Sequence, residues 1–134
     1  MRGGDISNEV PQRVVVSLDC ILIRRPAIQK FLGIVKNIEE VEYSRQSLSH
    51  FWRFSQKHGY TMELAGFGYT KKEMAEVLED LDNLGTNPFN YVSSYRTAAD
   101  LSAELPYRPE VKYVIDIPTR ALTYGHWYLE MGKI

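Results

Sequence analysis

The sequence contains a single cysteine, Cys20, and this scarcity excludes several kinds of protein. One cysteine cannot form a disulfide within the chain, so nothing in it requires an oxidising compartment. It cannot supply the paired thiolates of a structural zinc site either, and the three histidines lack the spacing of metal ligands. We therefore expect a cytoplasmic protein in which Cys20 packs as a small apolar side chain rather than acting as a nucleophile.

Long hydrophobic runs and an excess of one charge are missing as well. The first apolar run, residues 14–23, is interrupted by Asp19 and is far shorter than the ~20 residues that cross a bilayer. It also lacks the flanks of a secretory signal, so we expect no targeting segment and no membrane association. The 16 Lys and Arg residues nearly balance the 17 Asp and Glu residues, which removes the simplest electrostatic argument for nucleic-acid binding.

The length of the chain fits one domain. Its 134 residues fall within the range of roughly 100 to 150 residues that is commonest for domains. Residues 1–12 are polar and contain turn residues such as Gly3, Gly4 and Pro11, which predicts a flexible N-terminal arm. Residues 13–134 are then expected to form a single domain.

Hydrophobic patterning predicts several strands after this arm. The β-branched run at 13–18 is typical of a central strand that is buried on both faces. Further strands are predicted at 60–64, 89–93 and 110–117. Residues 127–131 alternate between apolar and polar side chains, which predicts a half-buried edge strand.

Helical periodicity fills the intervals between these strands. Helices are predicted at 26–40, 44–59, 70–85 and 97–105. The helix at 44–59 has an apolar face formed by Leu48, Phe51 and Trp52. This alternation indicates an α/β protein with a small three-layer Rossmann-like fold around a mostly parallel central sheet of four to five strands.

Residues that begin and end helices support two of these assignments. Ser44 can cap the helix that follows it, and Thr70 with Glu73 forms the spacing of a capping box. Gly59 and Gly85 stand where the two helices should end. We therefore expect the helices at 44–59 and 70–85 to be well defined.

Polar residues follow the predicted strands at the edge where such folds bind ligands. Parallel α/β sheets bind ligands beyond the carboxyl ends of their strands. In this chain the residues at those ends are Asp19, residues 65–70, residues 93–96 and Asp116. Asp19 and Asp116 would be neighbours if their strands are adjacent. The alternative interpretation is that each aspartate only accepts backbone hydrogen bonds at its own turn.

Residues 14–22, Val-Val-Val-Ser-Leu-Asp-Cys-Ile-Leu, resemble the first motif of the haloacid dehalogenase superfamily, in which a hydrophobic strand leads into Asp-x-Asp-Gly-Thr-Leu. In that register Ser17 stands where the family has its nucleophilic aspartate. Asp19 matches the second aspartate, the family's general acid and base. The resemblance implies a degenerate member, because a serine hydroxyl without an adjacent base stays protonated at neutral pH.

Two further motifs of that family concern the metal and a lysine. Asp116 matches one acid of the pair that would hold Mg²⁺ together with Asp19, and magnesium is the only cofactor that the resemblance implies. Lys112 lies near the position of the family's lysine.

The remaining motif is a hydroxyl that helps to hold phosphate at the end of the second strand. The predicted strand at 60–64 has no hydroxyl there; Gly66 and Gly68 instead lead to the helix start at Thr70, whose free amides could bind an anion. Another register would let Ser93 or Ser94 supply the hydroxyl. The alternative for the glycines is a tight turn, because a Gly-x-Gly without a third glycine is a weak phosphate motif.

Three functions follow as hypotheses. The first is a degenerate haloacid dehalogenase-like domain, without ordinary phosphatase activity, that binds a phosphorylated small ligand or a protein partner. The second is a small Mg²⁺-dependent phosphohydrolase that uses Asp19 and Asp116. The third is a protein without pocket chemistry that self-associates as a homo-oligomer. The small size and the eroded motifs are also compatible with a phage protein.

Overall fold

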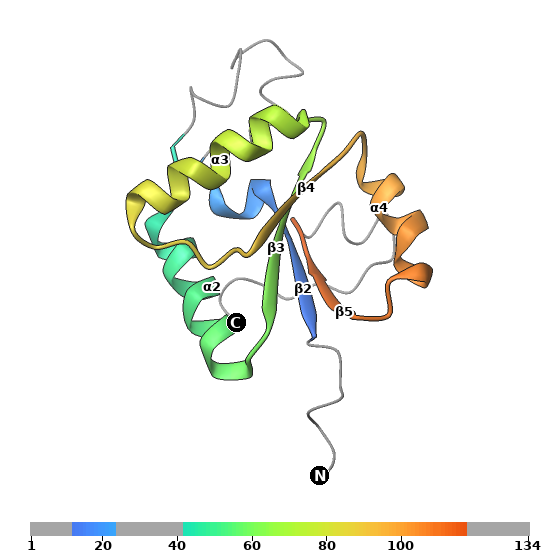
Figure 1. The fold of residues 1–134 in the computed structure, drawn as a ribbon, viewed down its shortest axis with the longest axis horizontal. Helices are drawn as coiled ribbons and strands as arrows, with labels where there is room; N and C mark the ends of the chain where they lie inside the picture. The colour runs from blue at the N-terminus through green and yellow to red at the C-terminus, as the bar shows by residue number, and fades with distance from the viewer. Residues whose placement is uncertain (1–11, 24–41, 118–134) are drawn as a thin grey trace.

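The computed structural model describes residues 12–23 and 42–117, and its centre is a four-stranded parallel sheet (Figure 1). The strands lie in the order β4-β3-β2-β5, and every adjacent pair is parallel. Their bounds are Arg13–Ser17 for β2, Thr61–Phe67 for β3, Tyr91–Tyr95 for β4 and Val111–Ile115 for β5. This arrangement confirms the predicted small α/β Rossmann-like fold.

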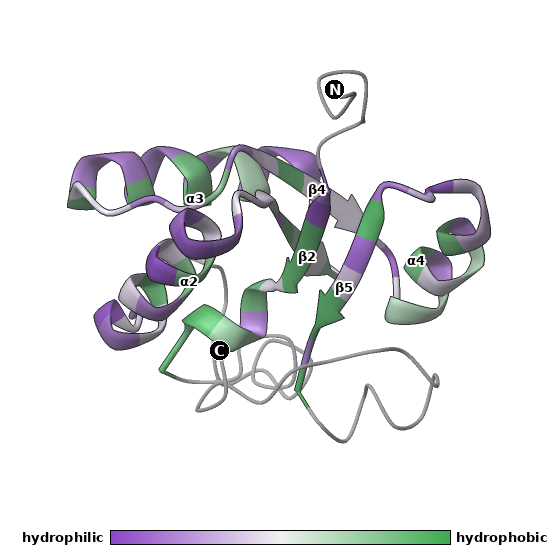
Figure 2. Cartoon of the chain, turned by 90° about the horizontal axis from the view of Figure 1, so that it is seen from below, coloured by the Kyte–Doolittle hydropathy of each residue, from purple (hydrophilic) through white to green (hydrophobic). Residues whose placement is uncertain are grey.

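Within the described residues, three α-helices cover the two faces of this sheet (Figure 1). Their bounds are Arg45–His58 for α2, Lys71–Leu84 for α3 and Ala98–Glu104 for α4. Helices α2 and α3 pack on one face, against Val14, Val16 and their neighbours, whereas α4 packs on the other face against Val15. Figure 2 shows the hydrophilic sides of α2 and α3 turned away from the sheet. Period-two alternation along each strand divides the core into these two layers.

The caps that the sequence predicts are formed. The Ser44 hydroxyl accepts a hydrogen bond from the Ser47 amide, and Thr70 and Glu73 make a reciprocal capping box. Gly59 and Gly85 end α2 and α3 in the left-handed conformation, with φ of 71° and 83°. Glycine adopts this conformation without the strain that a Cβ would add.

Several boundaries differ from the prediction. Strand β3 continues to Phe67, three residues beyond the predicted end, because residues 65–67 are buried and pair with β4, and Ala65 pairs with Ser17 of β2 as well. Trp52 was expected in the core, but 45% of it is exposed, and Phe54 occupies the buried position instead. Packing against the sheet sets which face of the helix is buried. The periodicity of one segment predicts the limits of that face only to within a residue or two.

Three predicted features lie outside the described residues. They are most of the arm at 1–12, the helix at 26–40 and the edge strand at 127–131. Within the residues that the structure does describe, no helix is both long and apolar enough to cross a membrane.

Candidate functional site at the carboxyl edge of the sheet

The sheet has a topological switch point between β2 and β5. The order of the strands leads from β2 to β3 and then to β4, and helices α2 and α3 cover one face of the sheet. The connection from β4 through α4 crosses the other face and returns to β5, on the opposite side of β2. Diverging connections leave a crevice at the carboxyl ends of the strands, where Rossmann-like folds bind their ligands. The residues at these two strand ends are therefore the first candidates for a site.

Ser17 ends β2, and its hydroxyl caps the turn that follows. The oxygen Oγ accepts a hydrogen bond from the Asp19 amide at 3.3 Å, which starts the single-turn 3-10 helix η2 (Leu18–Ile21). Only 2% of Ser17 is exposed. A buried hydroxyl in this role holds the turn rather than presenting a nucleophile to solvent.

Asp19 and Asp116 follow β2 and β5, which are adjacent, so the condition under which the sequence makes them neighbours is met. Val16 of β2 pairs with Ile115 of β5, so the carboxyl ends of the two strands lie side by side. The Cys20 Sγ also donates a hydrogen bond to the Ile115 carbonyl at 3.7 Å. The exposed fractions of Asp19 and Asp116 are 6% and 7%. One oxygen of Asp116 accepts a hydrogen bond from the Ile117 amide at 2.8 Å. Asp116 thus supports its own turn, in line with the alternative interpretation.

These donors do not fit a magnesium centre. Nowhere among residues 12–23 and 42–117 do three or more acidic, histidine or cysteine side chains gather as metal ligands would. Ser17 takes the place of a carboxylate, and one oxygen of Asp116 is already used by a backbone amide. Mg²⁺ requires close to ideal octahedral oxygen coordination. We therefore derive no metal chemistry from this end of the sheet.

Gly66 lies inside β3 rather than in a phosphate-binding loop. A Cβ built on Gly66 would come closer to the Met74 sulfur than the 3.0 Å that real Cβ atoms respect. The glycine therefore lets α3 pack closely against the sheet. This close approach corrects the expectation that Gly66 belongs to a ligand-binding turn.

Gly68, Thr70 and Ser94 join β3, β4 and α3 at the far side of the sheet from β5. The Gly68 amide donates to the Tyr95 carbonyl at 2.8 Å, and the Ser94 hydroxyl donates to the Tyr69 carbonyl. Thr70 bonds with Glu73, which also puts a carboxylate at the start of α3. Strands β4 and β5 are opposite edges of the described sheet, so these residues do not share a crevice with Asp116.

Lys112 is in β5, near the end of the strand where the chain enters the sheet. Its amine lies 5.9 Å from the centre of the Tyr60 ring and 5.8 Å from that of Tyr113. These cation–π contacts hold the charge beside two aromatic rings. The expected role of Lys112 beside Asp19 and Asp116 has no support in this placement, because the lysine precedes the carboxyl end of its strand.

A buried charged group that sequence reasoning missed lies on the α4 face of the sheet. Glu63 of β3 accepts hydrogen bonds from Arg13 at 3.0 Å, from Arg108 at 2.7 and 3.3 Å, and from Ser93 at 2.9 Å. We call these four residues the Glu63 cluster. Burial alone would raise the pKa of Glu63, but the hydrogen bonds from Arg108 and Ser93 and the two positive charges hold it below its usual value. The sequence signal that could have indicated this group is Glu63 itself, a single charged residue in an otherwise mostly apolar strand.

The Glu63 cluster extends to α4 through Tyr95. Arg108 donates to the Tyr95 hydroxyl at 3.0 Å, and that hydroxyl donates to Glu104 at 3.1 Å. Burial raises the pKa of Tyr95 to about 12; the Arg108 charge opposes this shift, and Glu104 adds to it. The hydrogen bonds with Glu63 raise the pKa of Arg108. These groups keep fixed charge states at neutral pH, as expected of a structural network.

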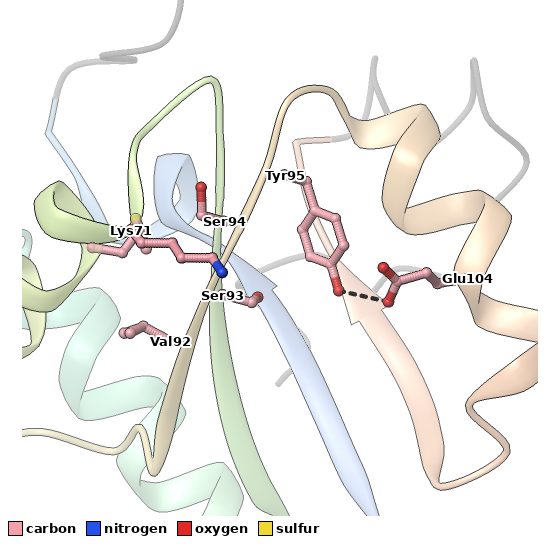
Figure 3. A pocket seen from close by; sticks show the side chains of 7 residues that line it. Lys71, Val92, Ser93, Ser94, Tyr95 and Glu104 are labelled. Atoms are coloured by element: carbon pink, nitrogen blue, oxygen red, sulfur yellow. Dashed lines mark hydrogen bonds between the residues drawn. The ribbon is translucent and has the colours of Figure 1, made fainter.

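A cavity of about 390 Å³ lies at the outer edge of β4 (Figure 3). Residues 92–95 form its floor, Lys71 and Met74 of α3 form one wall, and Glu104 of α4 forms the other. In Figure 3 the Lys71 side chain extends across β4 toward Ser93. The sequence predicted Ser94 as a ligand-binding residue, and it does line a cavity, but on the opposite edge of the sheet from Asp116.

Comparison of the chain with protein-family models, curated proteins and solved structures gave no match. The candidate functional surfaces of the described residues are therefore the switch point and the edge of β4. The switch point holds Ser17 and Asp116, whose buried side chains support their own turns, whereas the edge of β4 in the described sheet offers a mixed polar and apolar surface. The second is suited to binding.

Proposed function

We propose that the chain is a degenerate haloacid dehalogenase-like domain that lacks phosphatase activity and acts as a binding module for a protein partner. The observation that carries this proposal is the use of the Ser17 hydroxyl as a buried cap for Asp19. Phosphoryl transfer in that family needs an exposed carboxylate nucleophile at this position. A hydroxyl that accepts a backbone hydrogen bond inside the protein is not a substitute.

The geometry supports a protein partner better than a phosphorylated small ligand. The start of α3 carries the Glu73 carboxylate, which repels an anion from the amides there. Asp19 and Asp116 place two acidic groups at the switch point, where a phosphate would otherwise bind. The cavity beside β4 instead runs along a strand edge, a surface that peptides recognise.

Phosphatase assays test the first half of the proposal. Purified protein is incubated with an aryl phosphate and Mg²⁺, in parallel with the Asp19→Asn variant. We expect both proteins to release no phosphate above the protein-free blank. Turnover by the wild-type protein that disappears in Asp19→Asn would overturn the proposal.

That outcome would instead favour the second candidate, a small Mg²⁺-dependent phosphohydrolase. The neighbouring positions of Asp19 and Asp116 at the switch point are the observation in its favour. In that case Asp116→Asn should abolish the same activity, because Asp116 follows β5 and lies beside Asp19 at the switch point.

A further inference from the structure

We propose that the outer edge of β4 binds an extended segment of the partner protein as an additional strand, and that a carboxylate of this segment pairs with Lys71. The proposal rests on the binding function above and names the class of partner. It begins from the place of β4, which is an outermost strand among the described residues. Its residues are half-buried or exposed, with Tyr91 50% exposed, whereas β2 and β3 are almost wholly buried.

Backbone groups of two β4 residues face outward. The Tyr95 carbonyl accepts from the Gly68 amide, so Tyr95 directs its backbone groups toward β3. Alternate residues of a strand direct these groups to opposite sides, which turns the N–H and C=O of Val92 and Ser94 to the outer edge. These two residues lie on the floor of the cavity. An added strand would satisfy these groups while its side chains enter the cavity.

The charges beside this edge favour an acidic residue in the segment. Within the described part of the chain, no acidic group pairs with Lys71, and its amine lies over β4 (Figure 3). On the opposite wall, the Glu104 carboxylate already accepts a hydrogen bond from the Tyr95 hydroxyl. Arg96 forms an ion pair with Asp100 at 3.8 Å. The cation is thus the charge left for a ligand to meet.

A second copy of this chain fits the edge less well. Twofold antiparallel pairing of β4 with itself keeps each face of the sheet continuous, so α3 would lie beside α3 of the other copy. Lys71 would then approach its own counterpart across the axis, and like charges at such positions destabilise a pair. We therefore commit to an extended segment of a different protein.

Peptide selection on the full chain tests this inference. Random octapeptides are displayed and selected on the purified protein, and affinities of the recovered sequences are measured by fluorescence anisotropy. We expect β-branched sequences with Asp or Glu at a constant position. Failure to recover binding peptides, or recovery of peptides without that acid, would overturn the inference while leaving the phosphatase result untouched.

Charge reversal provides the sharpest variant. Lys71→Glu should weaken the selected acidic peptide by about tenfold, because an attraction worth up to about fivefold becomes a repulsion. The same peptide with its acid replaced by lysine should recover affinity for this variant. Lys72→Glu is the matched control, since Lys72 is a neighbouring exposed lysine that does not line the cavity. Equal losses in the two variants would contradict the specific pairing.

Backbone amides locate the bound strand. On peptide binding, hydrogen exchange at Val92 and Ser94 should slow at least about tenfold, because their amides gain partners in the added ladder. Val92→Pro removes one outward N–H and should reduce peptide affinity, whereas Ser93→Pro removes an inward N–H and should destabilise the fold itself. Protection elsewhere would refute edge binding, as would a dimeric solution mass that Val92→Pro makes monomeric.

Discussion

Replacing Glu63 by glutamine removes the charge at the centre of the Glu63 cluster with little change in shape. The carboxylate is surrounded only by donors, from Arg13, Arg108 and Ser93. A glutamine amide has one oxygen and one NH₂ group, so in either orientation a donor would face a donor. The charges of both arginines would also lose their buried partner.

The expected cost follows from burial. Removing one partner of a buried ion pair costs roughly 3–5 kcal/mol, and the lower end applies here because the side chains of Arg13 and Arg108 are 25% and 16% exposed. We therefore expect a loss of about 3 kcal/mol in the free energy of unfolding. With an unfolding entropy near 2.1 cal/mol/K per residue, this corresponds to a decrease in Tm of roughly 10 °C.

Urea denaturation followed by circular dichroism measures this change. The control is Glu110→Gln, which removes the partner that Arg108 meets through Nε at 3.5 Å, nearer the surface. That variant should lose less than about 0.5 kcal/mol. A loss below about 1 kcal/mol in Glu63→Gln, or equal losses in the two variants, would refute the assignment of Glu63 as the centre of a buried network.

Two further predictions concern pH and packing. Because the folded-state pKa of Glu63 is lowered, the stabilisation by this carboxylate is fully present above the unfolded pKa near 4.5 and is lost as the pH falls through the folded pKa. Urea denaturation should therefore show that the stability difference between wild type and Glu63→Gln shrinks below about pH 4.5. A difference that stays constant with pH would contradict this prediction. Gly66→Ala should lower the free energy of unfolding by about 1–3 kcal/mol, because the new methyl group collides with Met74. In thermal denaturation of the double variant, Met74→Ala should remove most of the loss that Gly66→Ala causes. Additive losses would show that the two side chains do not meet.

Local sequence determined the elements that need only neighbouring residues. The Ser44 cap, the Thr70–Glu73 box and the ends at Gly59 and Gly85 involve groups within four residues of one another, and all are formed. The β-branched run of β2 and the alternation of strands with helices also predict a parallel sheet without reference to any tertiary contact. Parallel strands end at one edge, so the sequence placed Asp19 and Asp116 at the same edge of the sheet, whereas the strand order decided that β2 and β5 are neighbours.

Tertiary structure alone decided how those elements are used. The order β4-β3-β2-β5 put Ser94 and Asp116 on opposite edges, and strand order depends on contacts between distant segments that no local pattern encodes. The bond of Glu63 to Arg108 spans 45 residues of sequence, and Gly66 owes its role to a side chain of another element. The edge position of β4 in the described sheet has the same origin, because a strand lies at an edge only when the other strands have taken their places.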